Sequence, residues 1–182
     1  VDFSLSYVWA WDGLPYSNFN TIIPTDTLGG IYVDSRLGFT RNHIFGIDIA
    51  ANIAGIGFWA EAAAFLPEKD YKMSTDLSAL NPLSPVPIVL DSTVLKKELY
   101  TKFILGADYN FANGSYLNFQ YLHGFIHEKG IKNLNDYFFL SFDFKLFEQK
   151  LKIAPIAGGV IISDWNDIEN NYSYVYMPEL SY

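Results

Sequence analysis

The sequence predicts an all-β protein, an antiparallel transmembrane β-barrel with about eight visible strands. From Leu99 to His127, large apolar residues alternate with polar or small ones on both sides of an Asn113-Gly114 turn, which is the pattern of a β-hairpin. The two runs reach about a dozen residues each, whereas ordinary strands have five or six and a tilted membrane-spanning strand needs about 9–11. Aromatic side chains gather near the turn, as in the girdles at membrane interfaces.

The composition agrees with a barrel wall and argues against other classes. Half of the 182 residues are hydrophobic and 18% are aromatic, yet the mean hydropathy is too close to zero for a helical membrane protein. The net charge of −8 leaves no basic patch for a phosphate backbone, so nucleic acid is not expected as a partner. The chain has no cysteine, and therefore neither a disulfide framework nor a thiolate metal site.

The window from Ile44 to Leu66 is apolar over the length of a membrane helix, but a helix is not what it predicts. A helix would place Asp48 and Glu61 in lipid, at a cost of roughly 2.5–3.5 kcal/mol for each charge near the centre. With a period of two, both carboxylates fall on the polar side of two strands. We therefore expect a hairpin with its turn at residues 52–55.

Long connections and short turns alternate along the predicted strands. The strands are expected at 2–11, 42–52, 56–66, 99–111, 116–127, 137–146, 150–163 and 172–182, with a bulge at Pro155 and with segment 31–41 extending its neighbour. Long polar loops are expected at 12–30, 67–96, 128–135 and 164–171, and short turns at 52–55, 112–115 and 147–149. All long loops then lie on one side, as the external loops of an outer-membrane barrel do. Residues 1–182 are expected to form one domain.

The polar side of these strands would face the barrel interior. In a wide barrel such residues line a solvated lumen and set its electric field, whereas in a narrow barrel they pair and fill the interior. Trp59 and Phe65 share this side, where they would either contact a sugar or hydrophobic solute or pack within a girdle. The candidate lumen-lining residues are Asp48, Trp59, Glu61, Glu98, Lys102, Asp108, Asn118, Gln120, Asp143, Lys145 and Lys152.

Catalysis and metal binding find little support in the sequence. A hydrolase needs a histidine beside a nucleophile and an orienting acid, but His123 lies on the apolar side of its strand and no glycine-flanked serine motif accompanies it. The acidic run from Asp164 to Glu169 offers oxygen ligands for Ca²⁺, but it lacks the EF-hand spacing and its central glycine. We predict no enzyme, no catalytic residue, no metal and no cofactor, and a solvated loop at 164–171.

Three runs resemble strands of the porin-like outer-membrane proteins of Gram-negative bacteria. They are Asn42-His43-Ile44-Phe45-Gly46-Ile47-Asp48, Gly57-Phe58-Trp59-Ala60-Glu61-Ala62, and the stretch from Gly106 to Tyr121. The likeness covers most of residues 40–182 and is to the large barrels related to substrate-selective porins and exporters. It implies a bacterial outer-membrane location, a barrel of more than eight strands of which this chain is a segment, and contact with membrane lipid and lipopolysaccharide.

The expected function is passive passage of small solutes through a polar lumen, with the 67–96 loop narrowing its mouth. The alternative is a small closed barrel that serves as a structural anchor, an adhesin or an assembly partner of other outer-membrane or periplasmic proteins. In that case the aromatic strand 172–182 would be the last of a complete eight-stranded barrel. A third interpretation is a soluble lipid-binding barrel whose aromatic sides point inward.

Overall fold

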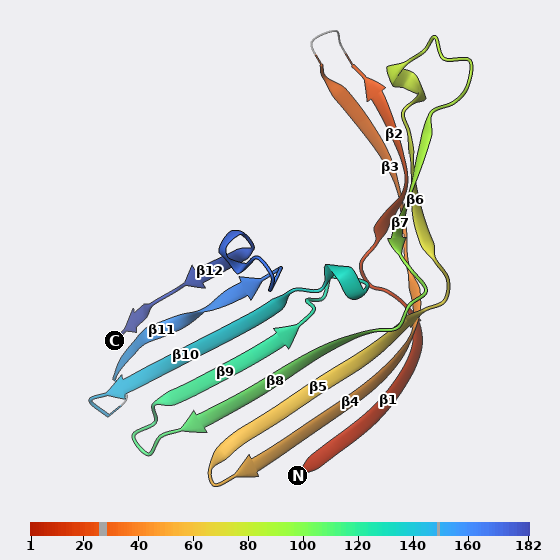
Figure 1. The fold of residues 1–182 in the computed structure, drawn as a ribbon. Helices are drawn as coiled ribbons and strands as arrows, with labels where there is room; N and C mark the ends of the chain where they lie inside the picture. Colours follow the sequence, from red (N-terminus) through yellow and green to blue (C-terminus); the bar gives the residue numbers. More distant parts are fainter. Residues whose placement is uncertain (26–28, 149) are drawn as a thin grey trace. The chain divides into compact units, whose positions relative to one another are not determined.

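The computed structural model describes residues 1–25, 29–148 and 150–182, and it is all-β (Figure 1). This confirms the all-β part of the prediction, with a nine-stranded antiparallel sheet, but no sheet closes into a barrel among the described residues. The strands are β1 (Asp2–Trp11), β2 (Tyr16–Pro24), β3 (Ile31–Gly38), β4 (Arg41–Ile53), β5 (Ile56–Pro67), β6 (Tyr71–Asp76), β7 (Val89–Leu95), β8 (Tyr100–Asn110), β9 (Tyr116–His123), β10 (Asp136–Leu146), β11 (Leu151–Ile162), β12 (Tyr172–Tyr176) and β13 (Glu179–Ser181), with single 3-10 turns η1 (Ser78–Leu80), η2 (Ile131–Asn133) and η3 (Ile168–Asn170).

The chain divides into two compact units rather than the expected one. The first comprises Val1–Tyr7, Phe45–Phe65 and Tyr100–Tyr182, and the second comprises Val8–Ile44 and Leu66–Leu99. The described residues contain no helix that is both long and apolar enough to cross a membrane.

A nine-stranded sheet makes up most of the first unit. Its strands follow the order β1-β4-β5-β8-β9-β10-β11-β12 (Figure 1), and β12 and β13 pair with successive parts of β11. Among the described residues, β1 and β12 each have a neighbour on one side only, so the sheet is open. The predicted strand 172–182 is split because Pro178, which has no N–H to donate, separates β12 from β13.

Short turns join the long strands at 52–55 and 112–115, as predicted, whereas residue 149 of the turn predicted at 147–149 lies outside the described residues. Ala54 and Gly55 both have positive φ, of 53° and 84°, which is the conformation of a tight hairpin turn, and the Asn52 side chain accepts a hydrogen bond from Gly55 N–H. At the next hairpin Gly114 has a φ of 82°. The predicted Pro155 bulge is confirmed, since the register between β10 and β11 shifts from Phe142↔Ile156 to Phe144↔Ile153.

A separate four-stranded sheet, in the order β3-β2-β6-β7, belongs to the second unit. Three of its strands, β2, β6 and β7, come from the segments 12–30 and 67–96, so the expectation that these are irregular loops is wrong. The segment 31–41 does not extend β4 either; most of it is β3, which pairs with β2 from Tyr16↔Gly38 onward. By contrast, 128–135 and 164–171 hold only turns, as predicted.

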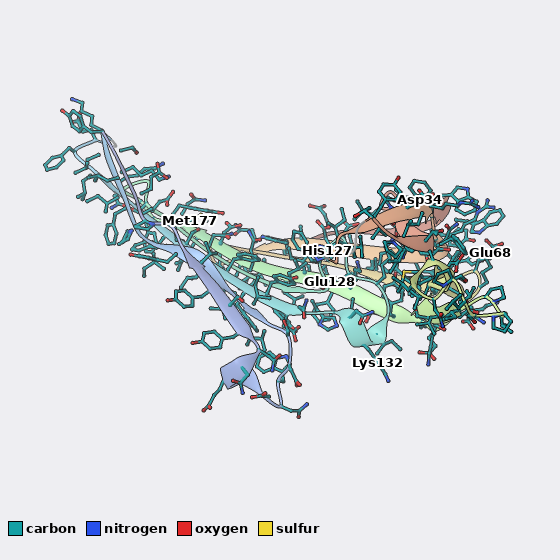
Figure 2. All side chains as sticks on the ribbon, turned by 90° about the horizontal axis from the view of Figure 1, so that it is seen from above. Asp34, Glu68, His127, Glu128, Lys132 and Met177 are labelled. Carbon is teal, nitrogen blue, oxygen red and sulfur yellow. The ribbon has the colours of Figure 1, made fainter. Side chains whose placement is uncertain are left out.

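The nine-stranded sheet has two chemically different faces. Phe45, Phe119 and Leu140 project from its apolar face and remain 52%, 43% and 40% exposed, so nothing among the described residues covers them. Side chains stand on both sides of the strands (Figure 2). The buried hydrophobic side chains among the described residues are few: Tyr71, Leu95, Tyr100, Tyr137 and Ala154. An exposed apolar face of this extent is typical of an interaction surface.

Candidate functional site: the polar face of the nine-stranded sheet

Most of the predicted lumen-lining residues lie on one face of the sheet. Asp48 on β4, Glu61 on β5 and Lys102 on β8 line a shallow hollow of about 300 Å³. The Ser4 hydroxyl of β1 donates a hydrogen bond to the Asp48 carboxylate, which extends this face to the edge strand. The period of two therefore placed these side chains correctly.

A row of polar side chains crosses β8 and β9. Asp108 is paired in register with Asn118, and Gly106 is paired with Gln120. The Gln120 amide donates to the Asn118 side-chain oxygen at 2.9 Å, and the Asn118 amide donates to the Tyr116 hydroxyl at 3.3 Å. Because these amides bond mainly to one another along β9, they form an ordered strip of donors and acceptors.

The Trp59 indole lies close over Gly106 of the neighbouring strand. Trp59 on β5 is paired with Gly106 on β8, and a Cβ at Gly106 would lie only 2.1 Å from the Trp59 ring. A glycine is thus required beneath the indole. The ring stands between Glu61 and the Asp108–Asn118 pair, and it gives the polar face one flat aromatic surface.

A second charged group lies on β10 and β11. The Lys152 ammonium is 3.3 Å from Asp143 and 2.9 Å from Glu179, while Lys145 is paired in register with Lys152. Glu179 was not predicted, because Pro178 interrupts the alternation of residues that identifies a face. Glu179 and Ser181 lie two residues apart on β13 and therefore point to the same face, and this spacing was the signal available in the sequence.

Glu98 is the predicted lumen residue that the structure places elsewhere. It lies between β7 and β8, in the second unit, and its exposed carboxylate is 3.7 Å from the Lys96 ammonium. The prediction extended the alternation of the following strand backward across its end. Glu98 is therefore removed from the candidate site.

The Lys102 ammonium donates hydrogen bonds to the Phe125 carbonyl at 2.7 Å and to the Ile126 carbonyl at 3.4 Å. Carboxylates outnumber ammonium groups over the whole face. The acids are Asp2, Asp48, Glu61, Asp108, Asp143 and Glu179, and the bases are Lys102, Lys145 and Lys152. The face thus carries a net negative charge.

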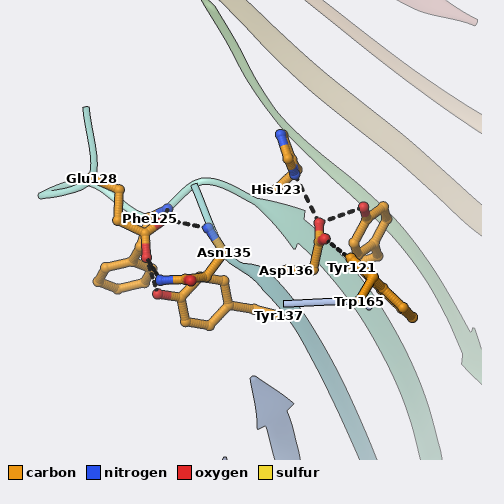
Figure 3. Close-up of polar contacts among 8 residues, drawn as sticks. All are labelled: Tyr121, His123, Phe125, Glu128, Asn135, Asp136, Tyr137 and Trp165. Carbon is orange, nitrogen blue, oxygen red and sulfur yellow. Dashed lines mark hydrogen bonds and ion pairs between the residues drawn. The ribbon is translucent and has the colours of Figure 1, made fainter. Parts of the chain in front are cut away.

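The Glu128 carboxylate organises the connection between β9 and β10 (Figure 3). It accepts hydrogen bonds from Phe125 N–H at 2.8 Å, from Asn135 N–H at 3.0 Å, from the Asn135 amide and from the Tyr137 hydroxyl at 2.5 Å. Burial alone would raise the pKa of Glu128, but these hydrogen bonds together hold that pKa below its ordinary value. Sequence periodicity gave no sign of this cluster, since its donors come from a loop.

A second carboxylate, Asp136, joins three aromatic side chains (Figure 3). It accepts from the Tyr121 hydroxyl at 2.6 Å and from the Trp165 indole N–H, and it is 2.8 Å from His123 Nδ1. The other described ring contact of His123 is the Phe103 ring, stacked at 5.1 Å. Neither contact supplies a nucleophile, so the pair anchors Trp165 and its loop without forming a hydrolytic triad.

Two carboxylates of the acidic segment 164–171 accept hydrogen bonds from within the segment. Asp164 accepts from Asn166 N–H at 2.9 Å, and Asp167 accepts from the Asn170 amide at 2.9 Å. Within the described ranges, no group of three or more histidine, aspartate or glutamate side chains converges in a way that would hold a metal ion.

Comparisons of the chain with protein-family models, with curated proteins and with solved structures found no match. What the fold and the site define is an all-β protein with a large open antiparallel sheet, apolar on one face and acidic on the other.

Proposed function

We propose that the nine-stranded sheet is part of the wall of a bacterial outer-membrane barrel, and that its polar face lines a porin-like passage for small solutes. The observation that carries this proposal is the exposed apolar face opposite a continuous acidic and amide-rich face. Alternation of this kind, with apolar residues toward lipid and polar residues toward water, characterises membrane barrels.

The strand lengths support the same proposal. β4 has 13 residues, β5 has 12 and β10 has 11. A strand of eleven residues spans about 36 Å at about 3.3 Å per residue, which a tilt near 45° reduces to about 25 Å. This matches the height of the apolar band of an outer-membrane barrel, about 25 Å.

A wall in lipid needs further strands at both edges. Unpaired N–H and C=O groups along β1 and β12 would cost several kcal/mol each in hydrocarbon, so membrane strands occur in closed barrels. In a porin-like barrel, additional strands of the protein or of another copy complete the ring, which leaves the polar face solvated.

One observation favours the smaller closed barrel instead. The main path of the sheet holds eight strands, from β1 to β12. β1 runs antiparallel to β4, because Tyr7 contacts Phe45 while Trp9 contacts His43, and the direction then alternates along the path. β1 and β12 are therefore antiparallel and suited to pair. Such a barrel is filled by side chains and would anchor or assemble rather than conduct.

The test is conductance of the intact protein, isolated from its native membrane and added to planar lipid bilayers. Discrete conductance steps, together with an intact mass well above 20.6 kDa, are expected for the porin-like barrel. Bilayer insertion without conductance would support the closed barrel. A protein that stays monodisperse without detergent would contradict both and would support a soluble lipid-binding barrel.

A further inference from the structure

Arg41, the first residue of β4, is held rigidly at its backbone. Its N–H donates to the Tyr71 hydroxyl at 2.6 Å, and that hydroxyl donates to the Arg41 carbonyl at 3.2 Å. Tyr71 is only 3% exposed, and Glu68 N–H donates to the same carbonyl at 2.9 Å. The arginine side chain therefore starts from a fixed position.

The Arg41 guanidinium lies on two tryptophans but lacks an anionic partner. Its Cζ is 3.5 Å from the Trp9 ring centre and 5.1 Å from that of Trp11. Its Nε is buried and has no hydrogen-bond acceptor, and no carboxylate of the described residues is within ion-pair distance. A desolvated charged donor without an acceptor is unfavourable, so a ligand that supplies oxygen atoms would be stabilising.

The surroundings define the class of that ligand. Arg41, Trp9 and Trp11 lie on the parity of the apolar face, at the end of β4 opposite its Ala54-Gly55 turn. His43 stacks on Trp9 at 5.9 Å, which adds a ring to the group. Amphipathic aromatic residues at the end of a spanning strand mark the headgroup level. At that level the abundant anion is phosphate, which a guanidinium binds through two parallel hydrogen bonds.

We propose that Arg41, with Trp9 and Trp11 beside it, binds the phosphate of a membrane lipid headgroup. The inference rests on the proposed function, because it requires the apolar face to contact lipid. The two indoles would cover the apolar part of the lipid next to its phosphate. The occupant is a phosphorylated lipid rather than a free anion, because the tryptophan surfaces beside the charge favour a ligand with hydrocarbon attached.

The nearest competitor inside the chain is Glu68. Its backbone is hydrogen-bonded to Arg41, but its exposed carboxylate does not reach the guanidinium. If Glu68 were the true partner of Arg41 in solution, removal of its charge would free the guanidinium and strengthen lipid binding.

The experiment titrates the intact protein in dodecyl maltoside with dioleoyl phosphatidic acid and follows tryptophan fluorescence. Dioleoylglycerol, which has the same chains without phosphate, and inorganic phosphate are the two comparison ligands. We expect saturable binding of phosphatidic acid, about tenfold or more weaker in Arg41→Ala, intermediate in Arg41→Lys, and unchanged in Arg36→Ala. Arg36 is the matched control, since it also lies over a ring, that of Phe19 at 5.5 Å.

Equal binding of phosphatidic acid by Arg41→Ala and the unmodified protein would overturn the proposal, and so would equal binding of dioleoylglycerol. If inorganic phosphate competed at the same concentration as the lipid, the site would be one for a free anion and not for a lipid headgroup. Arg41→Lys keeps the test informative if the alanine variant does not fold. Glu68→Gln should bind phosphatidic acid as the unmodified protein does; tighter binding would assign Glu68 as the partner of Arg41.

Failure of the unmodified protein to enter bilayers refutes the proposed function. Normal conductance together with unaffected lipid binding by Arg41→Ala refutes only the lipid site.

Discussion

Two glycines on the polar face differ in what lies above them, and this difference can be measured. A Cβ at Gly106 would meet the Trp59 ring at 2.1 Å, whereas a Cβ at Gly46 would meet the Ser6 hydroxyl, at 2.4 Å, which can rotate away. We expect Gly106→Ala to lower the free energy of unfolding by about 1–3 kcal/mol, because the indole must leave its position, and Gly46→Ala to cost clearly less.

The double variant Trp59→Ala/Gly106→Ala is the control for this prediction. Without the indole, the methyl group added at Gly106 has space. Gly106→Ala should therefore lower the free energy of unfolding of Trp59→Ala only slightly. Denaturant unfolding in detergent gives the free energies of unfolding of the unmodified protein, Trp59→Ala, Gly106→Ala and the double variant. If the two substitutions were additive, the close approach of Trp59 to Gly106 would not be the cause of the loss.

Glu128 predicts a pH dependence of stability. Its pKa is lower in the folded protein than its ordinary value near 4.5, so the carboxylate stabilises the fold at pH values above that ordinary value. This contribution is lost as the pH falls through the lower, folded-state pKa. We expect Glu128→Gln to cost about 1–3 kcal/mol at pH 7, and much less at a pH below the folded-state pKa. Unfolding free energies of both proteins at the two pH values test this, and a pH-independent difference would contradict it.

Residues within regular strands were predictable, and those that act across loops were not. Parity alone placed Asp48, Glu61 and Asp108 on one face because consecutive strand residues point to opposite sides. It failed for Glu98, which precedes β8, and it could not reveal Arg41 or Glu128. Their contacts join segments whose separation in sequence follows no period.

At the level of elements, Trp165 fastens the β11–β12 connection to the sheet. Its indole N–H donates to Asp136, and its ring meets Phe138 at 6.1 Å. Trp165→Phe keeps an aromatic ring but removes the donor, so we expect amide hydrogen exchange across residues 163–171 to become several-fold faster. Tyr121→Phe is the control, because it removes another donor to Asp136 from within β9 and should leave that segment protected. Equal effects of the two substitutions would show that Asp136, and not the indole bond, holds the loop.

The long membrane-type strands were predictable as elements, but the second sheet was not. Alternation over eight or more residues identifies β4, β5 and β8, and asparagine-glycine or alanine-glycine turns fix their ends. In β2 a register shift between Ser17 and Phe19 interrupts the period of two, and β6 has only six residues, so local turn signals outweighed the weak alternation. The parallel pairing of β2 with β6 is a long-range contact that no local pattern encodes.

For the whole molecule, the sequence indicated an amphipathic sheet but could not specify how the sheet closes. Closure depends on which strands flank β1 and β12, and the alternation of β1 resembles that of an internal strand. Because exposed edges promote pairing with further strands, both edges are expected to be covered in the assembled protein.

The charge of the polar face predicts the ion selectivity of that assembled protein. Among the described residues of this face, six carboxylates stand against three ammonium groups. Acidic rings attract cations into a pore, so the reversal potential in a KCl gradient should indicate preference for K⁺ over Cl⁻.

The triple variant Asp48→Asn/Glu61→Gln/Asp108→Asn should reduce this preference several-fold. Glu98→Gln removes an acid outside the face and should leave the preference unchanged. An equal loss in both variants would mean that overall charge, rather than the charge of this face, controls selectivity.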